Sequence, residues 1–167
     1  TEDRKEQGLL LPQAISVNTS LARLAGVASK GWIRRDEETS VAEAFVEKLK
    51  IKCHSILQEA KTLSGGNQQK VVLAKWLFRD PEILIFDEPT RGIDVGVKFE
   101  IYRLLIALSE EGRSIIMVSS DMPELFAVCD RIAVMSNGRL ADIFERGEWS
   151  EDGIVEAALS GYDSENS

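Results

Sequence analysis

Residues 83–90 read ILIFDEPT, an apolar run that ends in two adjacent carboxylates, Asp87 and Glu88. A short run without polar interruption predicts a strand that is buried on both faces, as in a parallel sheet. Open α/β sheets bind their ligands beyond the carboxyl ends of the strands, which is where the two acids lie. Because side chains alternate along a strand, we expect Asp87 and Glu88 to point in different directions and to take different tasks.

The two carboxylates suit a metal ion and a water molecule. Asp87 is suited to hold Mg²⁺ through the water shell of the ion. Glu88 is suited to position or deprotonate an attacking water. The alternative is a solvated acidic pair before a proline turn, and an isolated Asp-Glu-Pro sequence would favour that alternative.

Upstream, residues 63–70 read LSGGNQQK, which predicts the start of a helix that faces an anion. Ser64 is expected to cap the helix, and Gly65 and Gly66 leave room for a ligand close to the backbone. Asn67 and Gln68 follow at the same end, where free N–H groups and the helix dipole favour a phosphate. The alternative is a simple Ser-Gly-Gly turn, but the acidic motif downstream favours the phosphate.

The segments downstream alternate between helix and strand, which indicates the α/β class with a parallel sheet and an antiparallel edge. Asn137-Gly138 is a strong hairpin turn signal, and Gly112 is expected to end a helix. The sequence predicts helices over residues 67–78, 95–112, 122–130 and 150–161, and strands over 82–86 and 114–120 and within 131–144.

Residues 1–62 are expected to be small and mostly helical. One helix is predicted over residues 14–26, with Ser16 or Asn18 as its cap, and a second over 39–50, with Thr39 or Ser40 as its cap. Residues 26–36 are expected to form a loop. The polar tail, residues 162–167, is expected to fray.

Composition excludes several classes of function. The 167 residues hold 20 basic and 28 acidic side chains, a net charge of −8, so a nucleic-acid partner gains no electrostatic support. No apolar run approaches the ~20 residues that span a bilayer. Cys53 and Cys129 are interpreted as buried thiols of a cytosolic protein, and the single His54 allows no histidine-based metal cluster. The charged opening from Thr1 predicts a piece of a longer protein.

The two motifs together resemble those of the ATP-binding cassette family. LSGGNQQK resembles the signature motif of that family, ILIFDE its Walker B strand and RGID its D-loop, with Asp94 as the D-loop aspartate. The stretches EDRKEQGL, SVNTSL and SSDMPEL add a narrower resemblance, to the second cassette of the tandem ATPase subunits of ribose/galactose/xylose-type bacterial importers. The resemblance covers nearly the whole chain.

This resemblance implies a partial P-loop NTPase core, because no G-x-x-x-x-G-K-[ST] phosphate loop (Walker A) occurs in the sequence. We therefore expect the C-terminal part of a cassette, with a parallel sheet, an antiparallel C-terminal hairpin and a helical subdomain. The expected boundaries are 1–62 for the helical subdomain, truncated at its start, 63–161 for the C-terminal half of the catalytic core, and 162–167 for the tail.

Two positions depart from the family pattern. Many cassettes carry a histidine that touches the γ-phosphate, and Ser120 stands at the matching place in MVSSDMPE. A serine supplies neither the charge nor the proton-carrying capacity of imidazole, so we expect this site to hydrolyse ATP slowly or not at all. The Q-loop glutamine of the family is best matched by Glu2, at the start of the chain.

In the resembling family two cassettes pack head to tail around ATP and Mg²⁺. The resemblance implies that Ser64, Gly65, Gly66, Asn67, Gln68 and Asp94 bind the cofactor, with Ser64–Gln68 completing a site on another cassette. Asp87 as metal ligand, with Glu88 and Ser120 as catalytic residues, would belong to the other site.

The intact parent is thus expected to be an ATPase coupled to monosaccharide import, and this piece alone to be inactive. The implied partners are a second cassette, transmembrane permease subunits and, indirectly, a periplasmic sugar-binding protein, with no nucleic acid. The implied location is cytoplasmic, on the inner face of the membrane. The transported sugar is not indicated.

Two other functions fit parts of the sequence. A soluble cassette protein of translation or DNA repair carries similar motifs, but it usually adds coiled-coil, zinc or basic segments, which are not visible here. A pure interaction module with vestigial nucleotide machinery is a third reading, and the intact Asp87-Glu88 pair counts against it. Co-purification with a membrane protein without ATP dependence would favour it.

Overall fold

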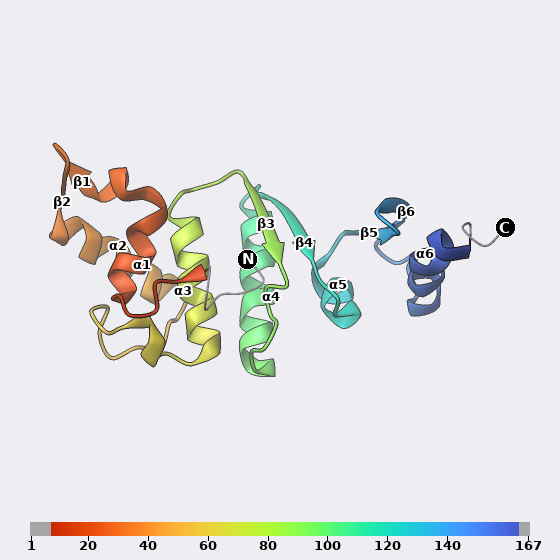
Figure 1. The fold of residues 1–167 in the computed structure, drawn as a ribbon, viewed down its shortest axis with the longest axis horizontal. Helices are drawn as coiled ribbons and strands as arrows, with labels where there is room; N and C mark the ends of the chain where they lie inside the picture. Colours follow the sequence, from red (N-terminus) through yellow and green to blue (C-terminus); the bar gives the residue numbers. More distant parts are fainter. Residues whose placement is uncertain (1–7, 164–167) are drawn as a thin grey trace. The chain divides into compact units, whose positions relative to one another are not determined.

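The structure, a computed structural model, describes residues 8–163. The chain divides into two compact units, Thr1–Val118 and Ser119–Ser167, a division that lies away from the predicted boundary after residue 62. The first unit contains the helices α1 to α4 and two small sheets, and the second contains a hairpin and two helices (Figure 1). Within residues 8–163, no helix is both long and apolar enough to cross a membrane.

The centre of the first unit is a β-α-β arrangement. Strand β3 (Ile83–Asp87) pairs in parallel with strand β4 (Ser114–Val118), from Ile83 opposite Ser114 to Asp87 opposite Val118. Helix α4 (Val95–Glu110) connects them and ends before Gly112, whose φ of +90° favours glycine. The predicted α/β class, the parallel pair and the helix end are confirmed.

Only one face of this sheet is covered by the described residues. Leu84 is 5% exposed and belongs to the main core, whereas Ile83 and Ile85 are 61% and 69% exposed. Ile116 and Val118 are likewise exposed on β4. The prediction of a strand buried on both faces is therefore wrong for residues 8–163, because alternate side chains point away from the only packed layer.

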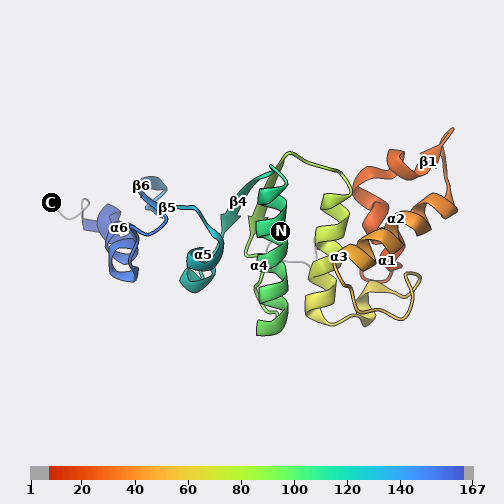
Figure 2. The same cartoon turned by 180° about the vertical axis from the view of Figure 1, so that it is seen from behind.

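Helix α3 (Gly65–Leu77) brings the two predicted regions of the first unit together. Its buried apolar side chains belong to one cluster with Ile15 from before residue 63 and Ile101 from α4. Helices α3 and α4 lie side by side when the unit is seen from either side (Figures 1 and 2). The main core thus spans the position where the sequence suggested a domain boundary.

Helix α1 (Ile15–Ser20) starts without a side-chain cap, so the predicted cap at Ser16 or Asn18 is wrong. The N–H groups of Ile15 and Ser16 instead donate to the carbonyls of Gln58 and Ile56. The 3₁₀ segment η2 (Leu21–Val27) follows, with a kink at Arg23. A long-range backbone contact therefore replaces the local cap that the sequence suggested.

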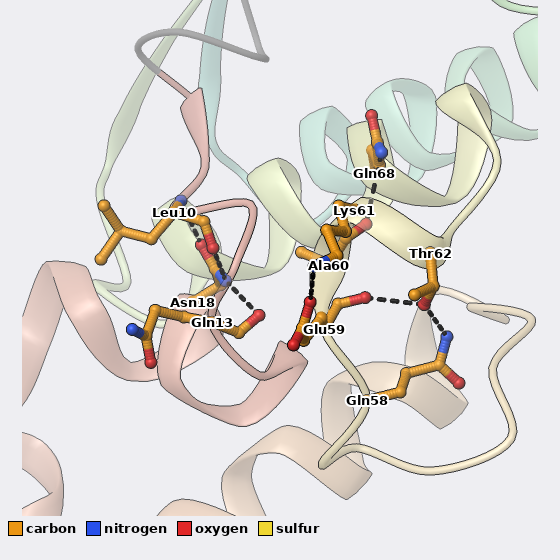
Figure 3. A network of polar contacts seen from close by, with 9 residues as sticks. All are labelled: Leu10, Gln13, Asn18, Gln58, Glu59, Ala60, Lys61, Thr62 and Gln68. Carbon is orange, nitrogen blue, oxygen red and sulfur yellow. Dashed lines mark hydrogen bonds and ion pairs between the residues drawn. The ribbon is translucent and has the colours of Figure 1, made fainter.

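Asn18 is fully buried and holds the segment before α1 rather than capping it. Its Oδ1 accepts from the N–H of Leu10 at 2.8 Å, and its Nδ2 donates to the carbonyls of Leu10 at 3.0 Å and Gln13 at 3.3 Å (Figure 3). Because the buried amide of Asn18 has these hydrogen-bond partners, it stabilises one conformation of the backbone before α1.

Residues 26–36 contain regular secondary structure, although a loop was predicted there. They include the antiparallel strands β1 (Ala28–Ser29) and β2 (Trp32–Ile33). Helix α2 (Arg35–Lys48) begins earlier than predicted, so neither Thr39 nor Ser40 is its cap. Three acidic residues in its first turn interact favourably with the helix dipole, which explains the earlier start. A short 3₁₀ turn, η3 (Ala60–Thr62), precedes α3.

The second unit is built on the predicted hairpin. Strands β5 (Arg131–Ser136) and β6 (Arg139–Glu145) pair antiparallel, and Asn137 and Gly138 have φ of +48° and +74°. Both values suit a type I′ turn, so the Asn-Gly prediction is confirmed. Within the second unit the hairpin forms a two-stranded antiparallel sheet.

Helices α5 (Met122–Val128) and α6 (Glu151–Asp163) complete the second unit. Ile132 and Val134 of β5 pack with Ile154 of α6 in a small core. Because α6 continues to Asp163, the expectation that the tail frays from residue 162 is wrong for its first two residues. Residues 164–167 lie outside the described part of the chain.

Candidate functional site

The amino end of α3 carries the glycine motif. Ser64 is the N-cap residue, but its side chain caps no backbone N–H, so the predicted serine cap is wrong. The Ser64 hydroxyl oxygen instead accepts from Nδ2 of Asn67 at 2.9 Å. The first hydrogen bond within the helix runs from the N–H of Gln68 to the carbonyl of Ser64. Helix geometry leaves the preceding N–H groups without an intrahelical acceptor, which suits an anion.

The amide side chains of this motif hold the surrounding loops. Oδ1 of Asn67 accepts from the N–H of Lys52 at 2.8 Å. Gln68 is 6% exposed, and its Nε2 donates to the carbonyl of Ala60 at 3.3 Å (Figure 3). The same Nε2 also donates to the carbonyl of Leu63 at 3.2 Å. The structure thus places Ser64 and Gly65 toward the surface, while Gly66 and Gln68 are buried.

The acidic motif lies at the carboxyl end of β3. Asp87 is the exposed last residue of that strand. Glu88 leaves the strand with a left-handed φ of +46°, while its N–H donates to the carbonyl of Val118 at 2.9 Å. The direction of the Glu88 side chain is therefore set by this turn. The expectation that alternation along the strand would set it is wrong. Non-glycine residues at positive φ occur in turns as well as at functional sites.

Asp94 starts helix α4 as its N-cap. Its Oδ1 accepts from the N–H of Val97 at 3.1 Å. The preceding turn contains Arg91 and Gly92, both exposed, with Gly92 at a φ of +66°. The capping bond fixes the entrance to α4 immediately after the acidic motif.

The remaining predicted site residues lie elsewhere. Ser120 is exposed and belongs to the second unit, two residues before α5. Beside it, the Ser119 hydroxyl donates to Oε2 of Glu124, whose side chain is 1% exposed. Glu2 lies outside the described residues.

Across residues 8–163, no group of three or more His, Cys, Asp or Glu side chains could hold a metal ion. Asp87 alone would therefore offer one carboxylate, and the other ligands of Mg²⁺ would be phosphate oxygens and water, which is the usual way that Mg²⁺ binds beside a nucleotide. The residues present fit a nucleotide-bound ion better than a dedicated metal centre.

Both cysteines are free and half-buried. Burial raises the pKa of the Cys53 thiol and, together with the Asp130 carboxylate, that of Cys129. The thiols are thus held in the neutral form, which supports their interpretation as ordinary rather than reactive cysteines.

An open groove of about 390 Å³ runs between α3 and β3. Val72, Leu73 and Trp76 line it from the helix, and Ile83 and Ile85 line it from the strand. Asp87 also lines it. The groove is mainly apolar, so its chemistry suits packing against other protein segments more than binding a charged phosphate.

Sequence reasoning missed an ion pair behind the glycine motif. Nζ of Lys70 lies 2.5 Å from Oε2 of Glu100 and also donates to the carbonyl of Lys50 at 3.0 Å. The Lys70 side chain is 6% exposed, so its charge requires this partner. The hydrogen bond from Lys70 lowers the pKa of Glu100 below its ordinary 4.5. No sequence pattern pairs these residues, since they lie on different helices.

We expect the Lys70–Glu100 pair to make stability depend on acid pH. The folded pKa of Glu100 is depressed, so its contribution is complete above pH 4.5 and is lost as pH falls through the folded pKa. The variant Glu100→Gln should therefore unfold at lower urea concentration than the unmodified chain at neutral pH, and this difference should shrink below pH 4.5.

Urea titrations at several pH values measure this difference. Glu110→Gln, an exposed carboxylate at the end of the same helix, is the control for a simple change of charge. The prediction would be contradicted if Glu100→Gln unfolded at a lower urea concentration than the unmodified chain by the same amount at every pH.

Comparison with known proteins shows the family of the chain. The family model described as ABC transporter matches residues 3–91, which is more than half of the chain. The chain belongs to the ABC transporter family. The match lies in the N-terminal part of this ABC transporter chain rather than its C-terminal part, so residues 92–167 fall outside it. The expectation that the resemblance covers nearly the whole chain is confirmed by curated relatives, which match 93–96% of it. The family model by itself does not place the chain at the C-terminal end of a second cassette.

Curated relatives cover more of the sequence. The ribose import ATP-binding protein RbsA of Halalkalibacterium halodurans is 48% identical over 161 residues, which is 96% of this chain and 32% of the relative. The L-arabinose transport ATP-binding protein AraG of Geobacillus stearothermophilus is 46% identical over 155 residues, 93% of this chain and 30% of the relative. This ABC transporter chain therefore spans about a third of the length of the curated relatives it matches.

Solved structures show the same fold. MJ1267, an ATP-binding cassette of an ABC transporter, has a TM-score of 0.76 at 22% identity, covering 93% of this chain and 66% of that chain. The dimeric post-hydrolysis structure of the cassette MJ0796, bound to ADP and Pi, has a TM-score of 0.70 at 20% identity, covering 87% and 62%. The ABC ATPase fold predicted from the two motifs is confirmed.

Proposed function

We propose that this ABC transporter chain is part of the ATP-binding subunit of a bacterial monosaccharide importer. The observation that carries the proposal is the amino end of α3, where the family's signature motif presents Ser64 and Gly65 toward the surface. The names of the relatives, which are ribose and arabinose import ATP-binding proteins, support the transported class. Which monosaccharide is carried would be decided by other subunits.

The glycine motif would act on a nucleotide held by another cassette. No phosphate loop occurs in the 167 residues, so this chain offers one wall of a nucleotide site rather than a complete one. The N–H groups at the start of α3 would bind terminal phosphate oxygens, with Ser64 and Gly65 at the surface and Asn67 and Gln68 holding the loops behind them. Asp94 would fix the adjacent surface through its cap on α4.

The acidic motif would serve a second nucleotide. ATP would supply the phosphoryl group, and Mg²⁺ would neutralise the negative charge of the phosphate oxygens. Asp87, exposed at the end of β3, would hold the ion through its water shell, and Glu88, in its left-handed conformation, would orient the attacking water. Ser120 would contact the γ-phosphate without exchanging a proton.

The partners follow from the same proposal. A second cassette would complete the nucleotide sites, permease subunits would carry the sugar, and a periplasmic binding protein would deliver it. Closure of two cassettes on ATP and reopening after hydrolysis would drive the permease. The subunit would lie in the cytoplasm against the inner face of the membrane, and this chain alone would not turn over ATP.

A calorimetric titration of Mg-ATP into the 167-residue chain tests this proposal. We expect no binding heat, because a helix end without a phosphate loop holds only one side of the nucleotide. The same titration into the full-length protein is the control and should show binding in the micromolar range. Micromolar binding by the 167-residue chain would contradict the trans arrangement, and no binding by the full-length protein would contradict the ATPase assignment itself.

A further inference from the structure

Gly66 is buried, and Val97 fills the space where its side chain would stand. A Cβ atom added to Gly66 would lie 2.8 Å from both methyl carbons of Val97 and 3.1 Å from the Val97 Cβ. A methyl group at position 66 therefore requires α3 and α4 to move apart. Val97 cannot easily turn away, because a β-branched side chain in a helix has essentially one χ1 rotamer.

A second contact repeats this arrangement one turn further along. Lys70 follows Gly66 by one turn of α3, and Glu100 follows Val97 by one turn of α4, so each pair shares one face of its helix. The Lys70–Glu100 ion pair, at 2.5 Å, therefore joins the same two faces as the Gly66–Val97 contact. Two successive contacts fix both the separation and the rotation of the helices.

These contacts lie next to both motifs that would face a partner. Gly66 is in the first turn of α3, directly after Ser64 and Gly65. The N–H of Val97 donates to Oδ1 of Asp94 at 3.1 Å, so Val97 belongs to the turn that Asp94 caps. A shift at the Gly66–Val97 contact would therefore move the amino ends of α3 and α4 relative to each other.

We propose that the Gly66–Val97 contact is a positioning device that holds the amino ends of α3 and α4 as one rigid surface for a partner cassette. Glycine is required at position 66 because Val97 occupies the space of its side chain, and not because the nucleotide approaches it. Gly66 and Val97 are thus positioning residues that act through Ser64, Gly65 and Asp94. This inference rests on the proposed function, since the surface acts on nucleotide held by another cassette.

The test compares Gly66→Ala, Val97→Ala and the double variant in the full-length protein assembled with its permease. We expect Gly66→Ala to lower the ATP turnover number by about 10- to 100-fold, because a misplacement of about 1 Å at a catalytic surface has effects of this size. The KM for ATP should change by less than about twofold, since the phosphate loop lies elsewhere. The double variant should recover to within about threefold of Val97→Ala, because the smaller side chain makes room for the methyl group.

Gly153→Ala is the matched control, because it adds the same methyl group within helix α6, outside the proposed surface, where the nearest atom is the hydroxyl oxygen of the Ser150 side chain at 3.1 Å. We expect it to keep the turnover of the unmodified protein. Thermal midpoints of all variants show whether each one folds. If Gly66→Ala does not fold, the ATP turnover of Val97→Ala is compared with that of the double variant. This comparison still tests whether the contact with Val97 requires the glycine.

Two results would overturn the inference. One is a Gly66→Ala protein with unmodified turnover. The other is a double variant that folds like Val97→Ala but has lost turnover, which would mean that the nucleotide itself requires the glycine. An unmodified protein that does not hydrolyse ATP would instead overturn the proposed function, and recovery of the thermal midpoint in the double variant would still support the contact.

Discussion

On the proposed function, Ser64→Asp in the full-length protein is expected to lower ATP turnover by about 100-fold while leaving the fold intact. Aspartate is a favoured N-cap residue, and a carboxylate at the positive end of α3 interacts favourably with the helix dipole, by about 0.3–1 kcal/mol. The new carboxylate can also accept from Nδ2 of Asn67, as the serine hydroxyl does. The same charge stands where a phosphate oxygen would bind, and it repels that phosphate. Stability and activity should therefore change in opposite directions.

Ser150→Asp is the matched control for this charge. Ser150 directly precedes α6, is exposed, and accepts from the N–H of Gly153 at 3.1 Å, so the substitution places the same carboxylate at another helix start. ATP turnover and the thermal midpoint are measured for both variants. We expect normal turnover in Ser150→Asp. If Ser64→Asp folds and turns over ATP at the same rate as this control, the amino end of α3 does not bind phosphate.

Ile101→Ala should lower the free energy of unfolding of the first unit by about 2–5 kcal/mol. Ile101 lies on α4, is 1% exposed, and belongs to the core that joins residues before Leu63 to α3 and β3. Removing three buried carbons loses their transfer free energy and leaves a cavity, since the surrounding helices relax only in part. Because the same core positions α3 against α4, the signature motif should loosen together with it.

Ile106→Ala makes the same chemical change on the same helix at a side chain that is 41% exposed. We expect it to cost less than about 1 kcal/mol, since little buried surface is lost and alanine favours the helix. Urea unfolding followed by circular dichroism measures both variants, and two transitions are expected from two compact units. Equal losses in the two variants would contradict the assignment of Ile101 to a shared core.

Features that depend on a few adjacent residues could be predicted from the sequence. The apolar run before Asp87 predicted strand β3, and Asn137-Gly138 predicted the hairpin turn with both residues at positive φ. Gly112 ends α4 as expected. In each case the physical cause is local, because it lies in the backbone freedom of one or two residues or in the periodicity of a short segment. The signature, Walker B and D-loop motifs were sufficient for the ABC ATPase fold.

Features that depend on distant residues were decided by the tertiary structure alone. Ser64 and Asn18 have the chemistry of helix caps, yet the Ser64 hydroxyl accepts from Asn67 and Asn18 bonds to Leu10, because packing brought other partners within reach. A run of apolar residues does not tell which face of β3 will be covered. Nor does a glycine show what occupies the space beside it. Val97 fills this space at Gly66 because α3 packs against α4. The two residues are 31 positions apart in the sequence, so no local pattern predicts their contact.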